Sequence, residues 1–318
     1  MNIDMLGDMQ NYVGLSELIE PYQLEDFLKN HWPNKPLYIP HHSNKLQVLL
    51  QLDCLKSLED LVDERRLKVR ACLPDFDDEY SSLLLDSEDA LKAYRNSMTL
   101  VFDSMQTQNS TIADSLTKIR NDLGLVVGGD QDLCRARSIV YATPGGTGTR
   151  LHFDANANFV IQVSGSKTWF LAPNESVNYP TERFTAGAAE ISFALEKQCH
   201  ALLLDELPEN HLKVDLQPGD VLFVPRGYWH ATETFEDSLS LNFTFSQPTW
   251  ADVFTKALQE HLLVQTEWRE LADGLASMDH DRKARSIEKF NMLVKKISTE
   301  LSDLDGANLL RESRLCQI

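Results

Sequence analysis

The stretch LHFDANANF, residues 151–159, places a histidine and an aspartate two positions apart in an otherwise apolar run. In an extended strand, residues i and i+2 point to the same face, so His152 and Asp154 share one face while Phe153 points to the other. Imidazole and carboxylate groups both bind transition metals. The pattern therefore predicts two converging ligands, and a third ligand is expected on a neighbouring strand.

The segment PGDVLFVPRGYWHATE, residues 218–233, supplies that third ligand in His230. Its prolines and glycines predict turns on either side of the buried strand VLFVP, so that His230 begins the next strand. Two histidines and one carboxylate on one face of an octahedral metal leave three positions open, as non-haem Fe(II) oxygenases require. We therefore expect His152, Asp154 and His230 to be the metal ligands of a catalytic centre.

Lys167 is the only charged residue in the two apolar strands of VIQVSGSKTWFLAP. Burying an unpaired ammonium group is costly, so this position predicts a bound anion; the alternative is a lysine that reaches solvent at the hairpin turn. A second polar pattern lies in SLSLNFTF, where Ser240, Asn242 and Thr244 share one face. That face fits either the wall of a site or an ordinary solvated sheet.

Closely spaced short strands surround these residues and predict an antiparallel sandwich or barrel. They are RARSIVYATP, TRLHFD, NFVIQVSGSKTWFLAP, HLKVDLQPGDVLFVP, HATETF and SLSLNFTF, preceded by MTLVF and a helix in SLTKIRNDLGL. Upstream, we expect a helix over residues 22–32 followed by the strand PLYIP, and a mixture of helix and loop over 43–97.

After Gln247 the apolar residues recur at the helical period of 3.6. One stripe begins at Trp250 and another at Ile287, and each must be buried either on the parent domain or in a dimer interface. We expect three regions: a mixed helix and strand segment over 1–97, a catalytic core over 98–247, and a helical segment over 248–318 that provides a homodimer interface.

Composition limits the remaining possibilities. The chain has 318 residues, 42% of them hydrophobic, which is enough for a full core. Its five cysteines form an odd set without CxxC spacing, and its N-terminus has no signal-peptide pattern, so a cytoplasmic location is expected. The net charge of −18 opposes binding to nucleic acid or membranes and favours a basic peptide partner, although it also serves plain solubility.

The segments HFDANANFVIQVSGSKTWFLAP, PGDVLFVPRGYWHATET and SLSLNF together resemble the JmjC and cupin-like branch of the Fe(II)- and 2-oxoglutarate-dependent oxygenases. The similarity is closest to protein hydroxylases of the asparaginyl-hydroxylase and ribosomal-oxygenase type. It covers about residues 141–245 and extends weakly to EDFLKNHWPNKPLYI. The resemblance implies a mainly β fold: a double-stranded β-helix, or jelly roll, with N-terminal α/β decoration and a C-terminal helical segment that often dimerises.

The resemblance also assigns roles around the metal. Fe(II) would be held by the three ligands, with O2 and 2-oxoglutarate as co-substrates, and Lys167 would bind the distal carboxylate of 2-oxoglutarate. Thr149, Asn158 and Asn242 match positions that line the co-substrate pocket, and Tyr141 would hydrogen bond its carboxylate. Arg150 is a candidate substrate contact. Tyr228 and Trp229 flank the site, either touching substrate or packing.

The expected activity is hydroxylation of an unactivated C–H bond, on a peptide or protein side chain. Lysyl demethylation and hydroxylation of a small molecule use the same iron chemistry and remain alternatives. A metal-dependent cupin-like isomerase and a non-catalytic scaffold are alternatives from other classes, and the joint presence of the triad and Lys167 argues against both. About 70 residues after Gln247 hardly suffice for the winged-helix domain usual in the ribosomal branch, which argues against a ribosomal-protein substrate.

Overall fold

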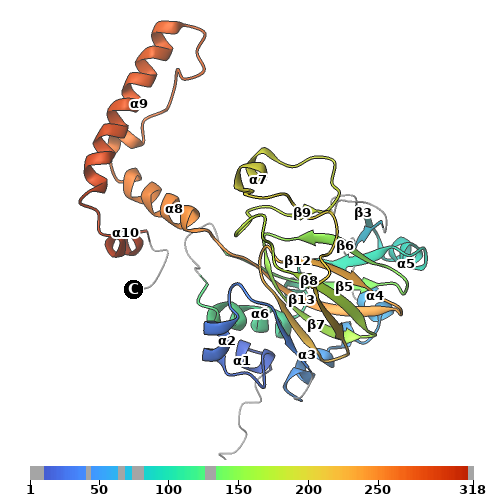
Figure 1. The fold of residues 1–318 in the computed structure, drawn as a ribbon. Helices are drawn as coiled ribbons and strands as arrows, with labels where there is room; N and C mark the ends of the chain where they lie inside the picture. Colours follow the sequence, from blue (N-terminus) through green and yellow to red (C-terminus); the bar gives the residue numbers. More distant parts are fainter. Residues whose placement is uncertain (1–10, 41–43, 64–68, 74–81, 126–133, 314–318) are drawn as a thin grey trace, which may run out of the picture. The chain divides into compact units, whose positions relative to one another are not determined.

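The computed structural model describes residues 11–40, 44–63, 69–73, 82–125 and 134–313. They divide into two compact units: one holds the described residues up to 125 and residues 135–246, and the other holds the chain from Gln247 onward together with Cys134. The first unit contains two antiparallel β-sheets with helices around them (Figure 1). The predicted fold class, mainly β with added helices, is confirmed.

The larger sheet has eight strands, all paired antiparallel, in the order β1-β11-β7-β13-β5-β4-β2-β3. The N-terminal segment, residues 1–97, contributes three of them, β1, β2 and β3, so it forms part of the same sheet as one wall of the candidate site. Their bounds are β1 Leu37–Ile39, β2 Val69–Cys72, β3 Ser82–Leu85, β4 Thr99–Phe102, β5 Arg135–Thr143, β7 Ala157–Ser164, β11 Val221–Val224 and β13 Ser238–Ser246.

The smaller sheet has five strands in the order β10-β8-β12-β6-β9 and carries most of the candidate metal and co-substrate ligands. Its strands are β6 Gly148–Phe153, β8 Lys167–Ala172, β9 Phe184–Thr185, β10 Leu212–Leu216 and β12 Trp229–Glu233. His230 on β12 pairs with both His152 on β6 and Leu171 on β8. The pairing therefore brings the two histidines of the HxD…H pattern side by side.

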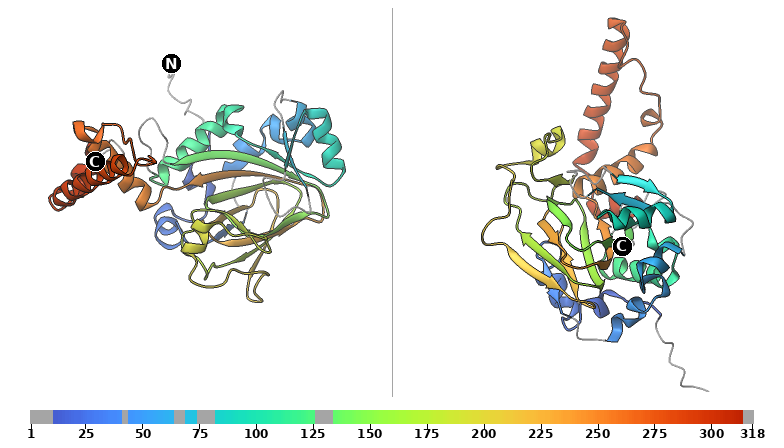
Figure 2. Two further views of the ribbon diagram at one scale, coloured as in Figure 1. Left: turned by 90° about the horizontal axis from the view of Figure 1, so that it is seen from above. Right: turned by 90° about the vertical axis from the view of Figure 1, so that its right-hand side faces the viewer.

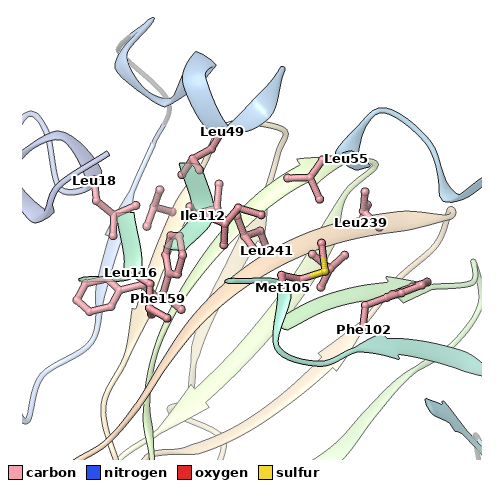
Figure 3. Close-up of a cluster of buried hydrophobic side chains, with 14 of the residues drawn as sticks. Leu18, Leu49, Leu55, Phe102, Met105, Ile112, Leu116, Phe159, Leu239 and Leu241 are labelled. Carbon is pink, nitrogen blue, oxygen red and sulfur yellow. The ribbon is translucent and has the colours of Figure 1, made fainter. Parts of the chain in front are cut away.

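The alternation of β13 explains how the larger sheet has two different faces. Leu239, Leu241, Phe243 and Phe245 belong to the main hydrophobic core, which also contains residues of the N-terminal helices. Figure 3 shows Leu239 and Leu241 among side chains from those helices, such as Ile112 and Leu116. The intervening polar residues line an internal cavity, so the polar face of β13 is the wall of a site.

A second, smaller apolar cluster joins the two sheets. It contains Val160 of β7 and Leu222 of β11 from the larger sheet, and Trp169, Leu171 and Val214 from the smaller one. Because this cluster contains side chains of both sheets, the sandwich is closed there by apolar packing. The polar cavity occupies another part of the inner faces.

Helices pack on the outer face of the larger sheet, and burial of their apolar sides supplies most of the main core. The sequence predicted two of them, α2 and α6, and the strand β1. It treated residues 43–97 as helix and loop, which is wrong for β2 and β3: both strands pair within the sheet. The helices are α1 Leu15–Leu18, α2 Leu24–Asn30, α3 Gln47–Leu50, α4 Leu58–Asp63, α5 Ser87–Arg95 and α6 Ser110–Asp122.

The connection from β8 to β10 has little regular structure apart from β9 and the helix α7, Phe193–Gln198. Figure 2 shows α6 and the segment around α7 on opposite sides of the strands. Phe184 of β9 pairs with Phe153 of β6, and both rings contact Trp229, with centroid distances of 6.2 and 4.7 Å. This aromatic cluster fixes the connection beside the end of β6 that carries Asp154.

The second unit is helical, with α8 Trp250–Leu263, α9 His280–Leu301 and α10 Gly306–Glu312. Val253 and Ala257 of α8 pack against Leu309 of α10. No residue of α9 is buried, and its apolar residues Phe290 and Val294 are exposed. Within the described ranges, none of the helices combines the length and apolar character needed to span a bilayer.

Gly148, the first residue of β6, lies against β12 so closely that an added Cβ would collide with the Thr232 carbonyl oxygen. We expect Gly148→Ala to lower the free energy of unfolding by about 1–3 kcal/mol, because two backbones must separate. Denaturant unfolding measures this loss. Gly306→Ala is the control, since an added Cβ there meets no atom within 4 Å; an equal loss in both variants would refute the backbone clash.

Candidate active site

A cavity of about 170 Å³ lies among the inner faces of the strands in the first unit. Both sheets contribute to its walls, with polar side chains predominating around the metal-ligand candidates. The residues that line it include all eight predicted site residues, together with Arg150: Tyr141, Thr149, Arg150, His152, Asp154, Asn158, Lys167, His230 and Asn242. The structure therefore brings the predicted residues together around one cavity.

His152, Asp154 and His230 converge within this cavity. The Oδ2 atom of Asp154 lies 4.0 Å from Nε2 of His152 and 3.7 Å from Nε2 of His230, and one ligand atom from each residue lies within 4.8 Å of the others. The imidazole rings have a centroid distance of 4.1 Å. Two nitrogens and one carboxylate oxygen thus face a common point, the donor set of a facial triad.

The backbone fixes the tautomer of both histidines. Nδ1 of His152 lies 2.7 Å from the carbonyl oxygen of Arg150, and Nδ1 of His230 lies 2.9 Å from that of Tyr228. A carbonyl oxygen can only accept, so each Nδ1 carries the proton and donates it. Each Nε2 then has its lone pair available to a metal, the arrangement found in metal-binding histidines.

Burial also keeps these imidazoles neutral. The pKa of His152 is well below its usual range because the ring is buried, and the charges of His230 and Arg183 lower it further. Burial lowers the pKa of His230 as well, although the carboxylate of Asp154 acts in the opposite direction. A metal therefore competes with few protons for these nitrogens near neutral pH.

Lys167 is buried, with 6% of its surface exposed, and does not reach solvent at the hairpin. Its Nζ donates a hydrogen bond to Oγ1 of Thr143, at 2.9 Å, across the two sheets. Burial lowers the pKa of Lys167 to about 8. A hydroxyl oxygen leaves the charge of the ammonium uncompensated, so an anionic ligand would stabilise it.

The remaining predicted pocket residues surround this lysine and the metal-ligand candidates. Thr149 forms a hydrogen bond with Thr232 through their hydroxyls, at 2.9 Å. Asn158 accepts a hydrogen bond from the hydroxyl of Thr244, at 2.7 Å. Tyr141 is half-buried on the same face of β5 as Thr143. These residues give the cavity a polar wall.

Two buried polar atoms that line the cavity have no hydrogen-bond partner in the described part of the chain. They are Oδ1 of Asn242 and the indole Nε1 of Trp169. A buried acceptor or donor without a partner costs free energy, and a polar ligand would satisfy both. The cavity therefore fits a metal ion at the triad together with an anionic co-substrate that has several oxygen atoms.

Comparison with known proteins agrees with this arrangement. The model of the JmjC domain matches residues 129–253, which include the three metal-ligand candidates and Lys167. This region is therefore similar to a JmjC domain. The family predicted from the sequence motifs is thereby confirmed.

Full-length relatives extend the similarity beyond the JmjC domain. The chain is 28% identical over 297 residues to the uncharacterized protein YxbC of Bacillus subtilis, covering 91% of this chain and 88% of that protein. It is 26% identical over 320 residues to ribosomal oxygenase 1 of Gallus gallus, covering 91% of this chain but 48% of that protein. The chain thus spans about half of the length of ribosomal oxygenase 1.

The solved structure of Escherichia coli ycfD has the same fold. It matches with a TM-score of 0.53 and 16% sequence identity, covering 87% of this chain and 67% of that one. At this level of identity, the likeness concerns the arrangement of the sheets and helices around the JmjC domain.

Sequence reasoning missed Arg183, which approaches the triad from the connection between β8 and β10. Its Nη1 lies 3.5 Å from Oδ1 of Asp154, whereas the other carboxylate oxygen, Oδ2, faces the histidines. This contact helps to orient Oδ2 toward the two imidazoles. Arg183 precedes the two-residue strand β9, which is too short to show a recognisable period, so only its position in the folded JmjC domain reveals it.

The residues whose roles the sequence left open are now placed. Arg150 is exposed at the cavity and holds His152 through its carbonyl oxygen. Tyr228 does the same for His230, while its ring packs on the apolar cluster between the sheets. Trp229 is fully buried among Phe153 and Phe184. Trp229 therefore packs the JmjC domain and is inaccessible to a substrate.

Proposed function

We propose that the chain is an Fe(II)- and 2-oxoglutarate-dependent oxygenase that hydroxylates a C–H bond of a protein side chain. One observation carries this proposal: the triad of His152, Asp154 and His230 shares its cavity with the buried ammonium group of Lys167. A metal-binding cupin without an oxo-acid co-substrate has no need of that buried cation. A triad with three open positions and an anion-binding lysine are together what such an oxygenase uses.

Within this function, Fe(II), 2-oxoglutarate and O2 supply the oxidising power, converting 2-oxoglutarate to succinate and CO2 while one oxygen atom enters the substrate. The protein binds and orients these groups. His152 and His230 present neutral Nε2 atoms because the carbonyl oxygens of Arg150 and Tyr228 hold their Nδ1 protons. Asp154 would complete the triad and offset part of the positive charge of the metal.

Lys167 would hold the distal carboxylate of 2-oxoglutarate by a charge-assisted hydrogen bond, which is strong in a buried site. Thr143 keeps the ammonium group in place from the opposite sheet. Oδ1 of Asn242 and Nε1 of Trp169, which have no partner among the described residues, would form hydrogen bonds with the same ligand. We assign Thr149, Asn158 and Tyr141 to the walls of this co-substrate pocket, as their positions on the cavity support.

A protein side chain is the proposed target. The length of the C-terminal segment argues against a ribosomal-protein substrate, but the similarity to ribosomal oxygenase 1 makes a ribosomal protein a candidate. The net charge of −18 supports a partner that is basic overall, because long-range attraction acts on the whole surface. Among the described residues, Cys54, Cys72, Cys134 and Cys199 form no disulfide bond, in keeping with the cytoplasmic location that we propose; Cys316 lies outside the described residues.

The proposal includes a homodimer formed through the C-terminal helices. The 22-residue helix α9 has no buried residue, yet it presents Ile287, Phe290, Val294 and Leu301, each at least 38% exposed. Such an apolar stripe needs a partner surface, and a second copy of the same stripe would cover it. Light scattering of the full chain should give twice the mass of one chain, and Phe290→Glu should give the mass of a single chain.

Turnover is tested with the purified full chain, Fe(II), 2-oxoglutarate and ascorbate in air, by following succinate. Basic ribosomal proteins and peptides are then screened by mass for a gain of about 16 Da, one oxygen atom. Succinate formation that requires added Fe(II), with a mass gain on a protein, would support the proposal. Loss of a methyl group from a methylated lysine would instead favour demethylation, and absence of succinate with every candidate would refute the oxygenase assignment.

The pKa of about 8 for Lys167 predicts how 2-oxoglutarate binding depends on pH. As pH rises from 7 to 9, the empty site loses its positive charge, so affinity should fall, approaching tenfold per pH unit above 8. Both histidines have lowered pKa values and do not titrate in this range. Titrations at pH 7, 8 and 9 measure the effect. A Lys167→Arg variant keeps its charge and should show a flat profile.

A further inference from the structure

The described residues that line the cavity carry a charge opposite to that of the whole chain. The protein has a net charge of −18, with 48 acidic and 30 basic residues. Among the described residues that line the cavity, however, the cations are Arg137, Arg150, Lys167 and Arg183, and the one carboxylate is Asp154. Under the proposed function, 2-oxoglutarate takes Lys167 and the metal takes Asp154. The arginines then determine the charge that a substrate encounters.

Strand register places two of these arginines at the end of the cavity opposite Lys167. On β5, Thr143 bonds Lys167, and Arg137 lies six residues away on the same face, roughly 20 Å along the strand. Arg137 pairs with Thr244, which in turn pairs with Asn158 near the start of β7. Asn158 follows Asp154 by four residues, so this end of the larger sheet adjoins the Asp154 end of β6.

The smaller sheet shows the same order from one end to the other. Lys167 begins β8, Trp169 pairs with Thr232, and Leu171 pairs with His230. Arg183 follows at the far end, 3.5 Å from Asp154, with 28% of its side chain exposed. Both sheets therefore have the lysine end of the cavity on one side and an arginine on the other, and the triad of the smaller sheet lies next to Arg183.

This order determines where a substrate can approach. With 2-oxoglutarate at the lysine end, the target C–H bond must reach the metal from the arginine end. Arg137 is exposed there, so its guanidinium group is accessible to a partner. Arginine presents several N–H donors in a planar fork that matches a carboxylate.

Resting on the proposed function, we propose that the substrate segment carries a carboxylate side chain, Asp or Glu, within a few residues of the target, and that Arg137 binds it. The acidic chain surface attracts a partner that is basic overall, whereas Arg137 selects an acidic residue next to the site of reaction. The two effects act at different ranges, since surface charges are screened beyond roughly 10 Å at 0.1 M salt.

Peptide pools test this without knowledge of the natural substrate. Three pools of labelled nine-residue peptides have random uncharged sequences, with both positions two residues from the centre fixed as Glu, Gln or Lys. Binding to the full chain loaded with Mn(II) and 2-oxoglutarate is measured by fluorescence anisotropy. We expect the Glu pool to bind about three- to tenfold more tightly than the Gln pool, in the range of partly exposed ion pairs, and the Lys pool to bind most weakly.

Variants identify the residue responsible. Arg137→Gln should remove most of the difference between the Glu and Gln pools, and Arg137→Glu should make the Lys pool the best. Arg135→Gln removes the same charge from the same strand at a position that does not line the cavity, so it should retain the Glu preference. Arg183 also contacts Asp154, so a change in peptide binding by an Arg183 variant could come from the metal site and does not decide the question.

Several results would overturn the inference: no preference for the Glu pool, a preference for the Lys pool, undetectable binding of every pool, or a Glu preference unchanged in Arg137→Gln. Failure of the proposed function is separable from these outcomes. It would show as absence of 2-oxoglutarate binding and of succinate formation in the same preparation. An active oxygenase that binds the Lys pool best would refute only the inference of an acidic residue in the substrate.

Discussion

Replacement of Lys167 by methionine is expected to weaken 2-oxoglutarate binding by roughly 30- to 5000-fold while metal binding is retained. Removing one partner of a buried, hydrogen-bonded charge pair costs about 2–5 kcal/mol, and each 1.4 kcal/mol is about tenfold in affinity. Lys167 fits this case because it is 6% exposed and its hydrogen bond to Thr143 is with a neutral hydroxyl. Methionine keeps the length of the apolar stem and removes only the charge and its donors.

The same substitution should leave the ligand-free fold intact or slightly more stable. The pKa of Lys167 is lowered to about 8 by burial, which means that the fold disfavours the ammonium form. Exchange of a buried charge for an apolar side chain of similar volume is often neutral or stabilising. Denaturant unfolding of the ligand-free protein therefore separates loss of binding from loss of structure.

The measurement is an anaerobic titration of the Fe(II)-loaded protein with 2-oxoglutarate, following the weak visible charge-transfer band of the chelate. Wild type should develop the band, Lys167→Met should not at equal concentrations, and Lys167→Arg should recover part of it because the charge returns. Wild-type affinity in Lys167→Met would place the co-substrate elsewhere in the cavity.

Much of the β-sandwich could be predicted from the sequence, because the alternation of apolar and polar residues identifies its strands and their faces. The alternation in β13 predicted its two faces, and the i, i+2 spacing of His152 and Asp154 predicted their convergence, with His230 supplied by the neighbouring strand β12. The cavity wall formed by Ser240, Asn242 and Thr244 was one of two interpretations, and only the position of the second sheet decides between them.

The features that sequence could not predict depend on pairing with distant strands. β2 and β3 are four-residue strands in an acidic, leucine-rich region, and Leu83 and Leu84 of β3 are both exposed, so no alternation identifies them. They form because β4 and β2 provide partners for their backbones. The position of Arg183 was also unpredictable from the sequence, since its approach to Asp154 depends on the pairing of Phe184 with Phe153.

The second large effect is expected for Asp154→Asn, which should weaken Fe(II) binding by more than about 100-fold and reduce turnover to background. The amide removes the negative charge from the position that lies 4.0 and 3.7 Å from the two histidine nitrogens. Loss of an outer partner of a metal ligand already costs about 10- to 100-fold in affinity or activity, so replacement of a ligand itself should exceed that range.

Asp215→Asn provides the matched control, because it removes an equal charge from an exposed position on β10 that does not line the cavity. Metal binding is measured anaerobically by competition with a chromophoric chelator and, independently, by the rise in Tm on adding Fe(II). Wild type and Asp215→Asn should show the rise, and Asp154→Asn should not.

A chelator should bring the wild-type Tm down to the value of Asp154→Asn without unfolding the protein, because the sandwich is held by its own apolar clusters. Normal metal affinity in Asp154→Asn would mean that the carboxylate is not a ligand. The ion would then rest on the two histidines alone, and the close approach of Asp154 to both rings would need another explanation.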